Sequence, residues 1–478
     1  MAAPRSHKSL AWIALACLVV PMFASYYFDD MFSSISYLFE NPALTQLGWD
    51  AAGYGLYTSG YSVLCVFGGL VVCGILLDKW GVRITGSIFV GMMAGGAGLV
   101  LWALLSGAAW SLQVAYVGCM LFGLGSEIAG TAVTRSIAKW FRGGPMALAM
   151  GLQLAIARLG TAFALVLSPR LVQQVSGHVY TLAETARPAV VGMGLMALGL
   201  ILWAVFVALD ARADRASRAG VSDGVAARGF VNGRGPDLSG RDSSEGAYRS
   251  DTPALETAPV ATDDTETFRF RDVLGVLGNK NFWLLGLLCV LFYSSIIAFK
   301  KFAGAILIPR FDIPASAAGW MVSMLPFSTV IFAPLFGMLV DRAGKGTRWM
   351  VLGAFLALAA HLLLAFAPAG VPLWGYLAMV FLGFGYSLVP AALWPSVPKI
   401  VPDKVLGTTF ALIYWVQNLG LLSFKWISGA ILGASAQAGP VRVELMFVGL
   451  CVAAVAVAFL LRRTAVRNPE LRLDAPNR

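Results

Sequence analysis

Long apolar stretches constrain this chain more than any other feature of its sequence. Of its 478 residues, 58% are hydrophobic and 13% are charged, and the apolar residues gather into twelve long stretches. Each stretch provides the roughly 20 residues that a helix needs to cross a bilayer. Because hydrocarbon offers no water to unpaired backbone groups, such stretches cross as helices. The sequence therefore predicts an all-α integral membrane protein with transmembrane helices near 11–37, 52–77, 84–105, 112–139, 146–170, 188–209, 282–308, 317–340, 349–367, 372–397, 406–431 and 441–461.

The basic residues of the loops predict the orientation of the chain. Lysine and arginine concentrate on one side of the predicted helices, for example at Lys79, Arg83, Lys139 and Arg142. The positive-inside rule assigns this side to the cytoplasm, so we expect both termini to be cytoplasmic. These loops account for the net charge of +10, and we expect no nucleic-acid partner.

The remaining composition argues against catalysis. All six cysteines fall inside predicted helices, and neither they nor the three histidines show the spacing of a metal site. The many glycines follow no nucleotide-binding pattern, and we find no paired acids or nucleophile triad. We therefore expect no metal, no cofactor and no enzymatic activity. The expected partners are the lipid bilayer and a small-molecule substrate.

Two charges inside predicted helices indicate a binding site. Glu127 lies 16 residues before Gly143, the centre of a short interhelical loop, and Arg158 lies 15 residues after it. At ~1.5 Å per residue both side chains lie roughly 23 Å from the loop, near the bilayer midplane. A charge there costs ~2.5–3.5 kcal/mol or more, which marks a functional site. An acid and a base at one depth suit a zwitterion, and the alternative is a structural ion pair.

Four further charges lie at matching depths of the first and seventh predicted helices. Asp29 and Asp30 stand about 18 residues into the first helix, and Lys300 and Lys301 stand about 18 residues into the seventh. We predict an outer gate of salt bridges that forms when the protein faces inward. Two alternatives are a lysine that meets a substrate carboxylate and charges that line a water-filled vestibule.

Other polar and aromatic residues of the second half are candidates for substrate contact. Lys425 either lines the cavity or snorkels to the outer interface. Tyr386 and Trp394 lie in the tenth predicted helix, which several prolines should bend. Gln417 and Asn418 need partners in the middle of the eleventh helix, and interhelical hydrogen bonds are the alternative to a ligand.

A polar segment divides the predicted helices into two sets of six. We expect a first bundle at 1–209, a disordered cytoplasmic linker at 210–281, a second bundle at 282–462 and a cytoplasmic tail at 463–478. The linker is rich in Gly, Ser, Ala, Asp and Arg and has no apolar period. Residues 268–274 at its end fit either a short interfacial helix or ordinary linker.

The two halves carry the same loop motif 263 residues apart. The motif residues are Gly74, Asp78, Lys79, Gly81 and Arg83 after the second helix, and Gly337, Asp341, Arg342 and Gly344 after the eighth. An internal duplication of this kind is typical of secondary transporters. Asp78 and Asp341 end their own helices, where the helix dipole disfavours an anion. We therefore expect each of them to seek the amino terminus of another helix.

This motif, G-x-x-x-D-[RK]-x-G-x-[RK], resembles the loop signature of the major facilitator superfamily. The resemblance implies two pseudo-symmetric six-helix bundles with alternating access at their interface. Longer stretches resemble the lysosomal dipeptide uniporters of this superfamily and their prokaryotic relatives. These stretches are 125–127, 139–141 and 151–160 in the first half, and 382–388, 392–395, 401–402, 406–408 and 417–421 in the second.

The closer resemblance implies transport of dipeptides with free termini, by uniport or with protons. Glu127 would meet the amino group and Arg158 the carboxylate. Organic anions such as dicarboxylates are an alternative, held by Arg158 with Lys300, Lys301 or Lys425, and a multidrug exporter is another. We expect a monomer in a bacterial cytoplasmic membrane, or in a lysosomal membrane if the source is eukaryotic, and the sequence predicts nothing about an accessory subunit.

Overall fold

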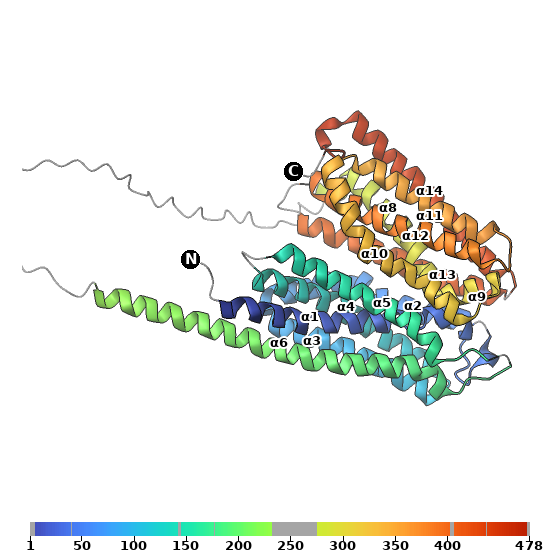
Figure 1. Ribbon diagram of the computed structural model, residues 1–478, viewed down its shortest axis with the longest axis horizontal. Coiled ribbons are helices and arrows are strands. Elements are labelled where there is room, and N and C mark those ends of the chain that lie inside the picture. The colour runs from blue at the N-terminus through green and yellow to red at the C-terminus, as the bar shows by residue number, and fades with distance from the viewer. Residues whose placement is uncertain are drawn as a thin grey trace, which may run out of the picture. The chain divides into compact units, whose positions relative to one another are not determined.

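The computed structural model describes residues 5–39, 41–141, 145–175, 177–231, 275–401, 406–435 and 437–475 (Figure 1). The part of the chain that it describes is almost entirely helical. The first half contains α1 (Arg5–Asp30), α2 (Ala51–Leu64), α3 (Leu70–Ser106), α4 (Ser111–Trp140), α5 (Met146–Leu171) and α6 (Leu182–Val231). The second half contains α8 (Lys280–Lys301), α9 (Ala303–Phe311), α10 (Ala315–Ala343), α11 (Gly346–Phe366), α12 (Pro372–Leu393), α13 (Leu406–Ala434) and α14 (Gly439–Arg467).

Ten helical segments of the described residues are long and apolar enough to cross a membrane. The part of α3 from Lys79 to Ser106 is one of these ten. The other two predicted crossings correspond to α13 and to a broken helix made of α2, the turn η3 and the start of α3 before Lys79. In that broken helix, the π-helical turn η3 (Cys65–Gly69) contains non-helical backbone at Phe67 and Gly68. The protein is thus a twelve-helix membrane protein of two six-helix bundles, as predicted.

The repeated loop motifs have matching backbone conformations. Gly81 interrupts α3 with φ 75° and ψ 170°, and Gly344 follows α10 with φ 61° and ψ −141°. Such positive-φ geometry is essentially restricted to glycine. The motif glycines therefore end one transmembrane helix and redirect the chain into the next in both halves.

The helix α6 is longer than the sequence indicated. It continues past residue 209 to Val231, because the Ala- and Arg-rich residues that follow have high helix propensity. The expected linker from 232 to 274, including the candidate interfacial helix at 268–274, lies outside the described residues. The tail is partly ordered, with a short 3₁₀ helix, η6 (Pro469–Leu471).

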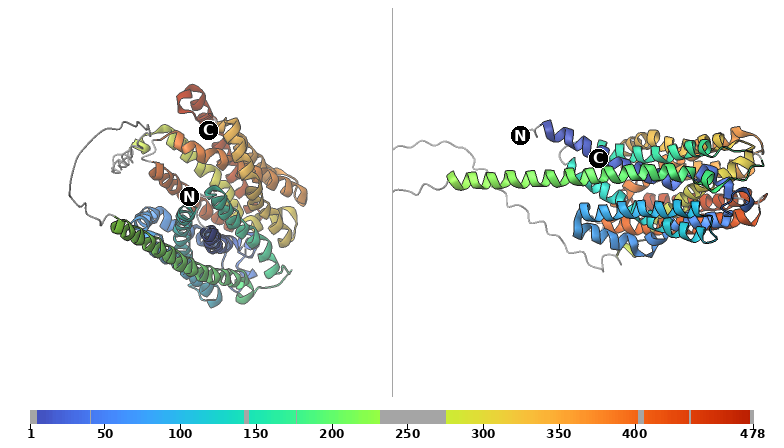
Figure 2. Two further views of the ribbon diagram at one scale, coloured as in Figure 1. Left: turned by 60° about the vertical axis from the view of Figure 1, so that its left-hand side comes forward. Right: turned by 90° about the horizontal axis from the view of Figure 1, so that it is seen from below.

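The two halves contact each other at one end. We call the end at which α1 begins and α14 ends the terminal side, and the opposite end, where α9 lies, the far side (Figures 1 and 2). The main contacts between the halves are α2 with α13 and α5 with α10. Near the far side the backbones of α2 and α13 touch, since a Cβ built on Gly55 would lie 2.8 Å from the Cα of Gly429.

The same helices are exposed toward the terminal side. Leu154 of α5 is 49% exposed and Met338 of α10 is 50% exposed, whereas Leu165 and Met321, nearer the far side, are fully buried. Close contacts between α5 and α10 also lie toward the far side, where a Cβ on Gly319 would meet the carbonyl oxygen of Leu165.

Candidate functional site

Glu127 is held by a tyrosine of another helix. Its Oε1 accepts a hydrogen bond of 3.1 Å from the Tyr61 hydroxyl, which also lies 3.2 Å from the Ser126 Oγ. Glu127 projects from α4 and Tyr61 from the last turn of α2. The carboxylate is thus oriented by a neutral donor and keeps its capacity to accept from a ligand.

Arg158 of α5 connects the two halves. Its Nη1 donates a hydrogen bond of 2.9 Å to the Tyr386 hydroxyl of α12. The guanidinium also lies over two aromatic rings, 5.5 Å from the centroid of Tyr26 and 5.3 Å from that of Tyr386. These cation–π contacts stabilise the charge in the membrane interior without neutralising it.

Glu127 and Arg158 lie at one level, as the loop spacing predicted. On α1, the Ser25 Oγ lies 2.5 Å from that of Ser126, the neighbour of Glu127. The next residue on α1, Tyr26, lies against Arg158. No ion pair joins Glu127 to Arg158 in the described part of the chain, so the contacts disfavour the structural-pair alternative. Each charge is instead contacted by tyrosine side chains.

Lys425 places a third charge beside this site. Its side chain projects from α13, is 2% exposed, and has its ammonium 5.3 Å from the centroid of the Tyr61 ring. Among the described residues no carboxylate forms an ion pair with it. The contact with Tyr61 favours the cavity over the snorkelling alternative. Tyr61 thus donates a hydrogen bond to Glu127 through its hydroxyl and contacts the Lys425 ammonium with the face of its ring.

An aromatic wall extends from Arg158 into the second half. We define it as Tyr386, Tyr293, Trp394 and Tyr414. The rings of Tyr293 and Tyr386 meet edge to face at 6.1 Å, and Trp394 stacks on Tyr414 at 5.0 Å. The Trp394 Nε1 donates to the Tyr293 hydroxyl at 3.2 Å. Trp394 begins the 3₁₀ helix η4 (Trp394–Lys399) that follows α12, so the proline-rich end of this helix positions the indole.

Gln417 and Asn418 lie inside the second bundle. The Gln417 Oε1 accepts from the thiol of Cys289 on α8 at 3.3 Å, and the Asn418 Nδ2 donates to the Tyr414 carbonyl one turn earlier. Both side chains are buried. The contact of Gln417 favours the interhelical hydrogen-bonding alternative, whereas Asn418 bonds within α13 and its buried Oδ1 has no hydrogen-bond partner among the described residues.

The four outer charges converge on the far side. Lys300 and Asp30 lie 2.6 Å apart, and Lys301 lies 2.8 Å from Asp29 and 3.0 Å from Asp30. Thr161 donates to Asp30 at 2.8 Å, and Lys301 also donates to the Asp29 carbonyl. Asp30 and Lys301 are almost fully buried. The ion pairs therefore join α1 to α8 at the closed end.

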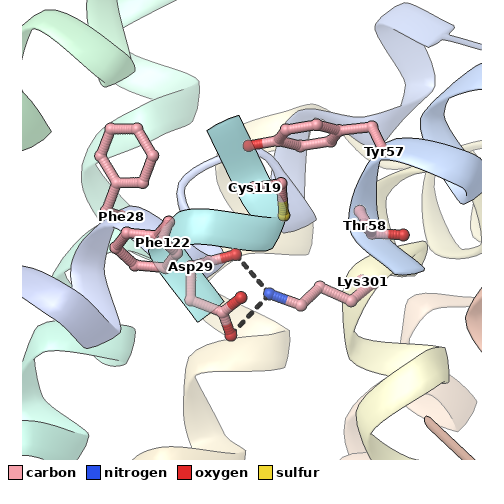
Figure 3. Close-up of a pocket in the computed structure, with 7 residues that line it drawn as sticks. All are labelled: Phe28, Asp29, Tyr57, Thr58, Cys119, Phe122 and Lys301. Carbon is pink, nitrogen blue, oxygen red and sulfur yellow. Dashed lines mark hydrogen bonds and ion pairs between the residues drawn. The ribbon is translucent and has the colours of Figure 1, made fainter. Parts of the chain in front are cut away.

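A small, partly open cavity lies beside these ion pairs. Asp29 and Lys301 line it together with Phe28, Tyr57, Thr58, Cys119 and Phe122 (Figure 3). Its volume of about 10 Å³ accommodates roughly one water molecule. The far side thus leaves no passage for a larger solute at this point.

The loop-motif residues lie at the terminal side. Lys79, Asp341 and Arg342 are exposed, while the Asp78 side chain lies outside what the structure describes. A Cβ at Gly74 or Gly337 would meet nothing within 4 Å. Among the described residues, no group of His, Cys, Asp or Glu could hold a metal ion.

Sequence reasoning did not identify four tyrosines of the site. Tyr26, Tyr61, Tyr293 and Tyr414 are common residues of membrane helices, whereas an isolated charge in an apolar stretch is conspicuous. The available signal was the hydroxyl, since a buried tyrosine usually needs a hydrogen-bond partner.

Comparisons with known proteins bear on this site. A family model described as the Major Facilitator Superfamily matches residues 18–424 and 282–475. Two similar proteins are both described as "Lysosomal dipeptide transporter MFSD1". The Danio rerio protein is 27% identical over 456 residues, which cover 92% of this chain and 87% of the relative. The Homo sapiens protein is 27% identical over 431 residues, which cover 87% and 78%.

Solved structures show the same fold. A mutant of the peptide transporter POT matches with a TM-score of 0.65 and 15% identity, covering 99% of this chain and 100% of the other. The inward open conformation of the xylose transporter XylE from E. coli matches with a TM-score of 0.64 and 11% identity, covering 95% of each chain. At these identities the likeness concerns architecture alone.

Proposed function

This chain belongs to the major facilitator superfamily, and we propose that it transports dipeptides across a membrane by alternating access. The observation that carries the proposal is the pair Glu127 and Arg158. They lie at one level inside the membrane, and each is held by a tyrosine rather than by the other. The similarity to lysosomal dipeptide transporters supports the same substrate class.

The chemistry of the two charges suits the two ends of a dipeptide. Glu127 accepts hydrogen bonds from the ammonium group, and Arg158 binds the carboxylate through its planar guanidinium. A substrate that lacks either terminus leaves one buried charge unpaired, which is unfavourable. The site therefore selects for free termini.

The second half contributes contacts of a different kind. The repeat offset places Pro390 and Leu421 at the positions equivalent to Glu127 and Arg158, so the charged site has no counterpart there. The aromatic wall offers apolar surface to substrate side chains instead, without a fixed hydrogen-bonding pattern. Such a surface tolerates many side chains while the first half binds the invariant termini.

Alternating access gives the far-side ion pairs the role of a gate. Asp29, Asp30, Lys300 and Lys301 hold the far side closed. The positive-inside rule makes the terminal side cytoplasmic. We infer an inward-facing state of a transporter in a bacterial cytoplasmic membrane.

Uptake by proteoliposomes tests the proposal. We expect saturable uptake of labelled Ala-Ala by the wild type and at least tenfold slower uptake by both Glu127→Gln and Arg158→Lys. Tyr376→Phe is the matched control, because Tyr376 is partly exposed and takes no part in the site. An imposed pH gradient distinguishes proton symport from uniport. Absence of uptake by folded wild-type protein would refute the proposal.

An organic anion is the second candidate, because Arg158 and Lys425 give the cavity two cations and Glu127 one acid. A dicarboxylate transporter should lose transport in Arg158→Lys and retain it in Glu127→Gln. Succinate uptake in the same vesicles decides between the two candidates.

A further inference from the structure

A dipeptide with two neutral side chains leaves one charge of the cavity unpaired. Its ammonium occupies Glu127 and its carboxylate occupies Arg158. Lys425 then remains, 2% exposed, and among the described residues its ammonium lies over the Tyr61 ring and forms no ion pair with a carboxylate. A buried ammonium without an anion is unfavourable, so the occupied site has a position for a second carboxylate.

Lys425 and Arg158 are separate cationic positions. The contacts of Arg158 are Tyr26 and Tyr386, and that of Lys425 is Tyr61. The nearby lysines of the gate are already paired with Asp29 and Asp30. One carboxylate at Arg158 therefore does not pair with Lys425, and in the part of the chain that the structure describes the gate acids pair with Lys300 and Lys301 and form no ion pair with Lys425.

The position of Lys425 determines which of the two dipeptide side chains it contacts. Glu127 and Lys425 contact the same tyrosine, one at the hydroxyl and one at the ring. An ammonium bound at Glu127 belongs to the first residue of the dipeptide. The side chain of that residue consequently lies nearest to Lys425, while the second residue lies toward Arg158.

We propose that Lys425 is a specificity residue that selects dipeptides with an acidic first residue, Asp or Glu. The inference rests on the proposed dipeptide transport and on the orientation that Glu127 and Arg158 impose. The carboxylate of the first side chain pairs with the Lys425 ammonium, and the isosteric amide does not. A charge-assisted hydrogen bond in a water-poor cavity is much stronger than its neutral counterpart.

Isosteric substrate pairs provide the test. We compare kcat/KM in proteoliposomes for Glu-Ala against Gln-Ala, and for Ala-Glu against Ala-Gln. The wild type should prefer Glu-Ala to Gln-Ala by at least about tenfold, which corresponds to about 1.4 kcal/mol. The ratio for the second pair should lie near one, because the second side chain lies away from Lys425.

Variants of Lys425 test whether this residue causes the preference for Glu-Ala over Gln-Ala. Lys425→Gln should bring the Glu-Ala to Gln-Ala ratio close to one, and Lys425→Arg should retain a preference. Arg442→Gln is the matched control, since it removes a positive charge from an exposed position of α14. It should leave the ratio unchanged.

The outcomes separate this inference from the proposed function. Equal kcat/KM for Glu-Ala and Gln-Ala in the wild type would overturn the role of Lys425 and leave dipeptide transport intact. A preference that persists in Lys425→Gln would also overturn it. Failure of the folded wild type to transport any of the four dipeptides would instead overturn the proposed function, and this inference with it.

Discussion

Among the single residues, Tyr61 organises the charged site. Its hydroxyl orients Glu127 of the first half, and its ring carries Lys425 of the second. An acid and a base of opposite halves are thereby held apart by one side chain. Among the described residues, Glu127 and Lys425 form no ion pair with each other, and each of them contacts Tyr61 instead.

Removal of the Tyr61 hydroxyl should therefore weaken substrate binding more than it weakens the fold. We expect Tyr61→Phe to raise KM for a dipeptide about fivefold to tenfold, because Glu127 loses a hydrogen bond worth ~1.5 kcal/mol. Counterflow kinetics measure the change, and thermal unfolding in detergent should show a small shift. Tyr376→Phe serves as control, and an unchanged KM in Tyr61→Phe would argue against the role of the hydroxyl.

The sequence indicated the charged residues of the candidate site and the aromatic residues Tyr386 and Trp394, but it did not indicate Tyr26, Tyr61, Tyr293 and Tyr414. Glu127 and Arg158 are conspicuous because a charge in an apolar stretch needs a reason. Their common depth followed from their spacing to one loop. Gln417 and Asn418 are equally unusual in a membrane helix, yet their partners lie in the second bundle. Which face of a helix lines the cavity depends on how that helix is rotated about its axis when all twelve helices pack. A single sequence does not reveal this rotation.

At the scale of elements, the motif glycines are needed for their backbone conformation. Gly344 ends α10 at φ 61° and ψ −141°, and a side chain there costs about 1–3 kcal/mol. We expect Gly344→Ala to lower the free energy of unfolding by this amount. Gly337→Ala is the control, because Gly337 is helical and its Cβ would meet open space. Equal stability of the two variants by thermal unfolding would contradict this explanation.

The tail completes a helix that its own sequence leaves uncapped. Lys345, at the N-cap of α11, has no side-chain acceptor. Asp474 takes this role, since its Oδ1 accepts from the Thr347 backbone N–H at 2.9 Å and from the Thr347 hydroxyl at 2.8 Å. Leu473 beside it is buried. Leu473 and Asp474 therefore pack onto the second bundle.

Loss of this cap should reduce stability. We expect Asp474→Ala to cost about 0.5–2 kcal/mol, the usual effect of removing an N-cap acceptor. Asp474→Asn, which keeps an oxygen at the same position, should cost less. Glu470→Ala changes an exposed acid of the same tail and should have no effect. A thermal midpoint for Asp474→Ala equal to that of Glu470→Ala would refute the capping role.

The sequence predicted the number and arrangement of the transmembrane helices better than it predicted their kinks, their ends and the contacts of the tail. The apolar stretches and the repeated motif predicted twelve helices in two bundles, because burial in lipid allows little else. The kink at Gly68, the length of α6 and the docked tail depend on local backbone choices and on contacts between distant segments. Asp474 and Thr347 are far apart along the chain, and nothing in either neighbourhood predicts the other.

At the scale of the whole molecule, the far-side closure combines ion pairs with close backbone packing. The ion pairs are buried, and removal of one partner typically costs 3–5 kcal/mol because a charge remains without its counterion. The glycine contact adds steric fit, since a Cβ on Gly429 would lie 2.6 Å from the Cα of Gly55. The ion pairs and the glycine contact stabilise the closed far side only while the two halves are in contact there.

A side chain at Gly429 should therefore hold the far side open. The atoms that it would meet belong to the backbone of α2, so no side-chain rotation relieves the overlap and the halves must separate there. We expect Gly429→Val to slow dipeptide uptake more than tenfold while the protein stays folded. Gly449→Val is the control, because a Cβ on Gly449 meets nothing within 4 Å.

Cys119 provides a native reporter of this opening. It lines the small cavity beside the gate and is 6% exposed in this structure (Figure 3). A membrane-impermeant maleimide added from the far side should label Gly429→Val faster than the wild type, which opens this side only transiently, and Cys119→Ser in the variant should abolish the labelling. Labelling equal to that of the wild type, with uptake preserved, would mean that α2 and α13 adapt without parting. The glycine contact would then be a packing detail, and closure of the far side would rest on the ion pairs between α1 and α8.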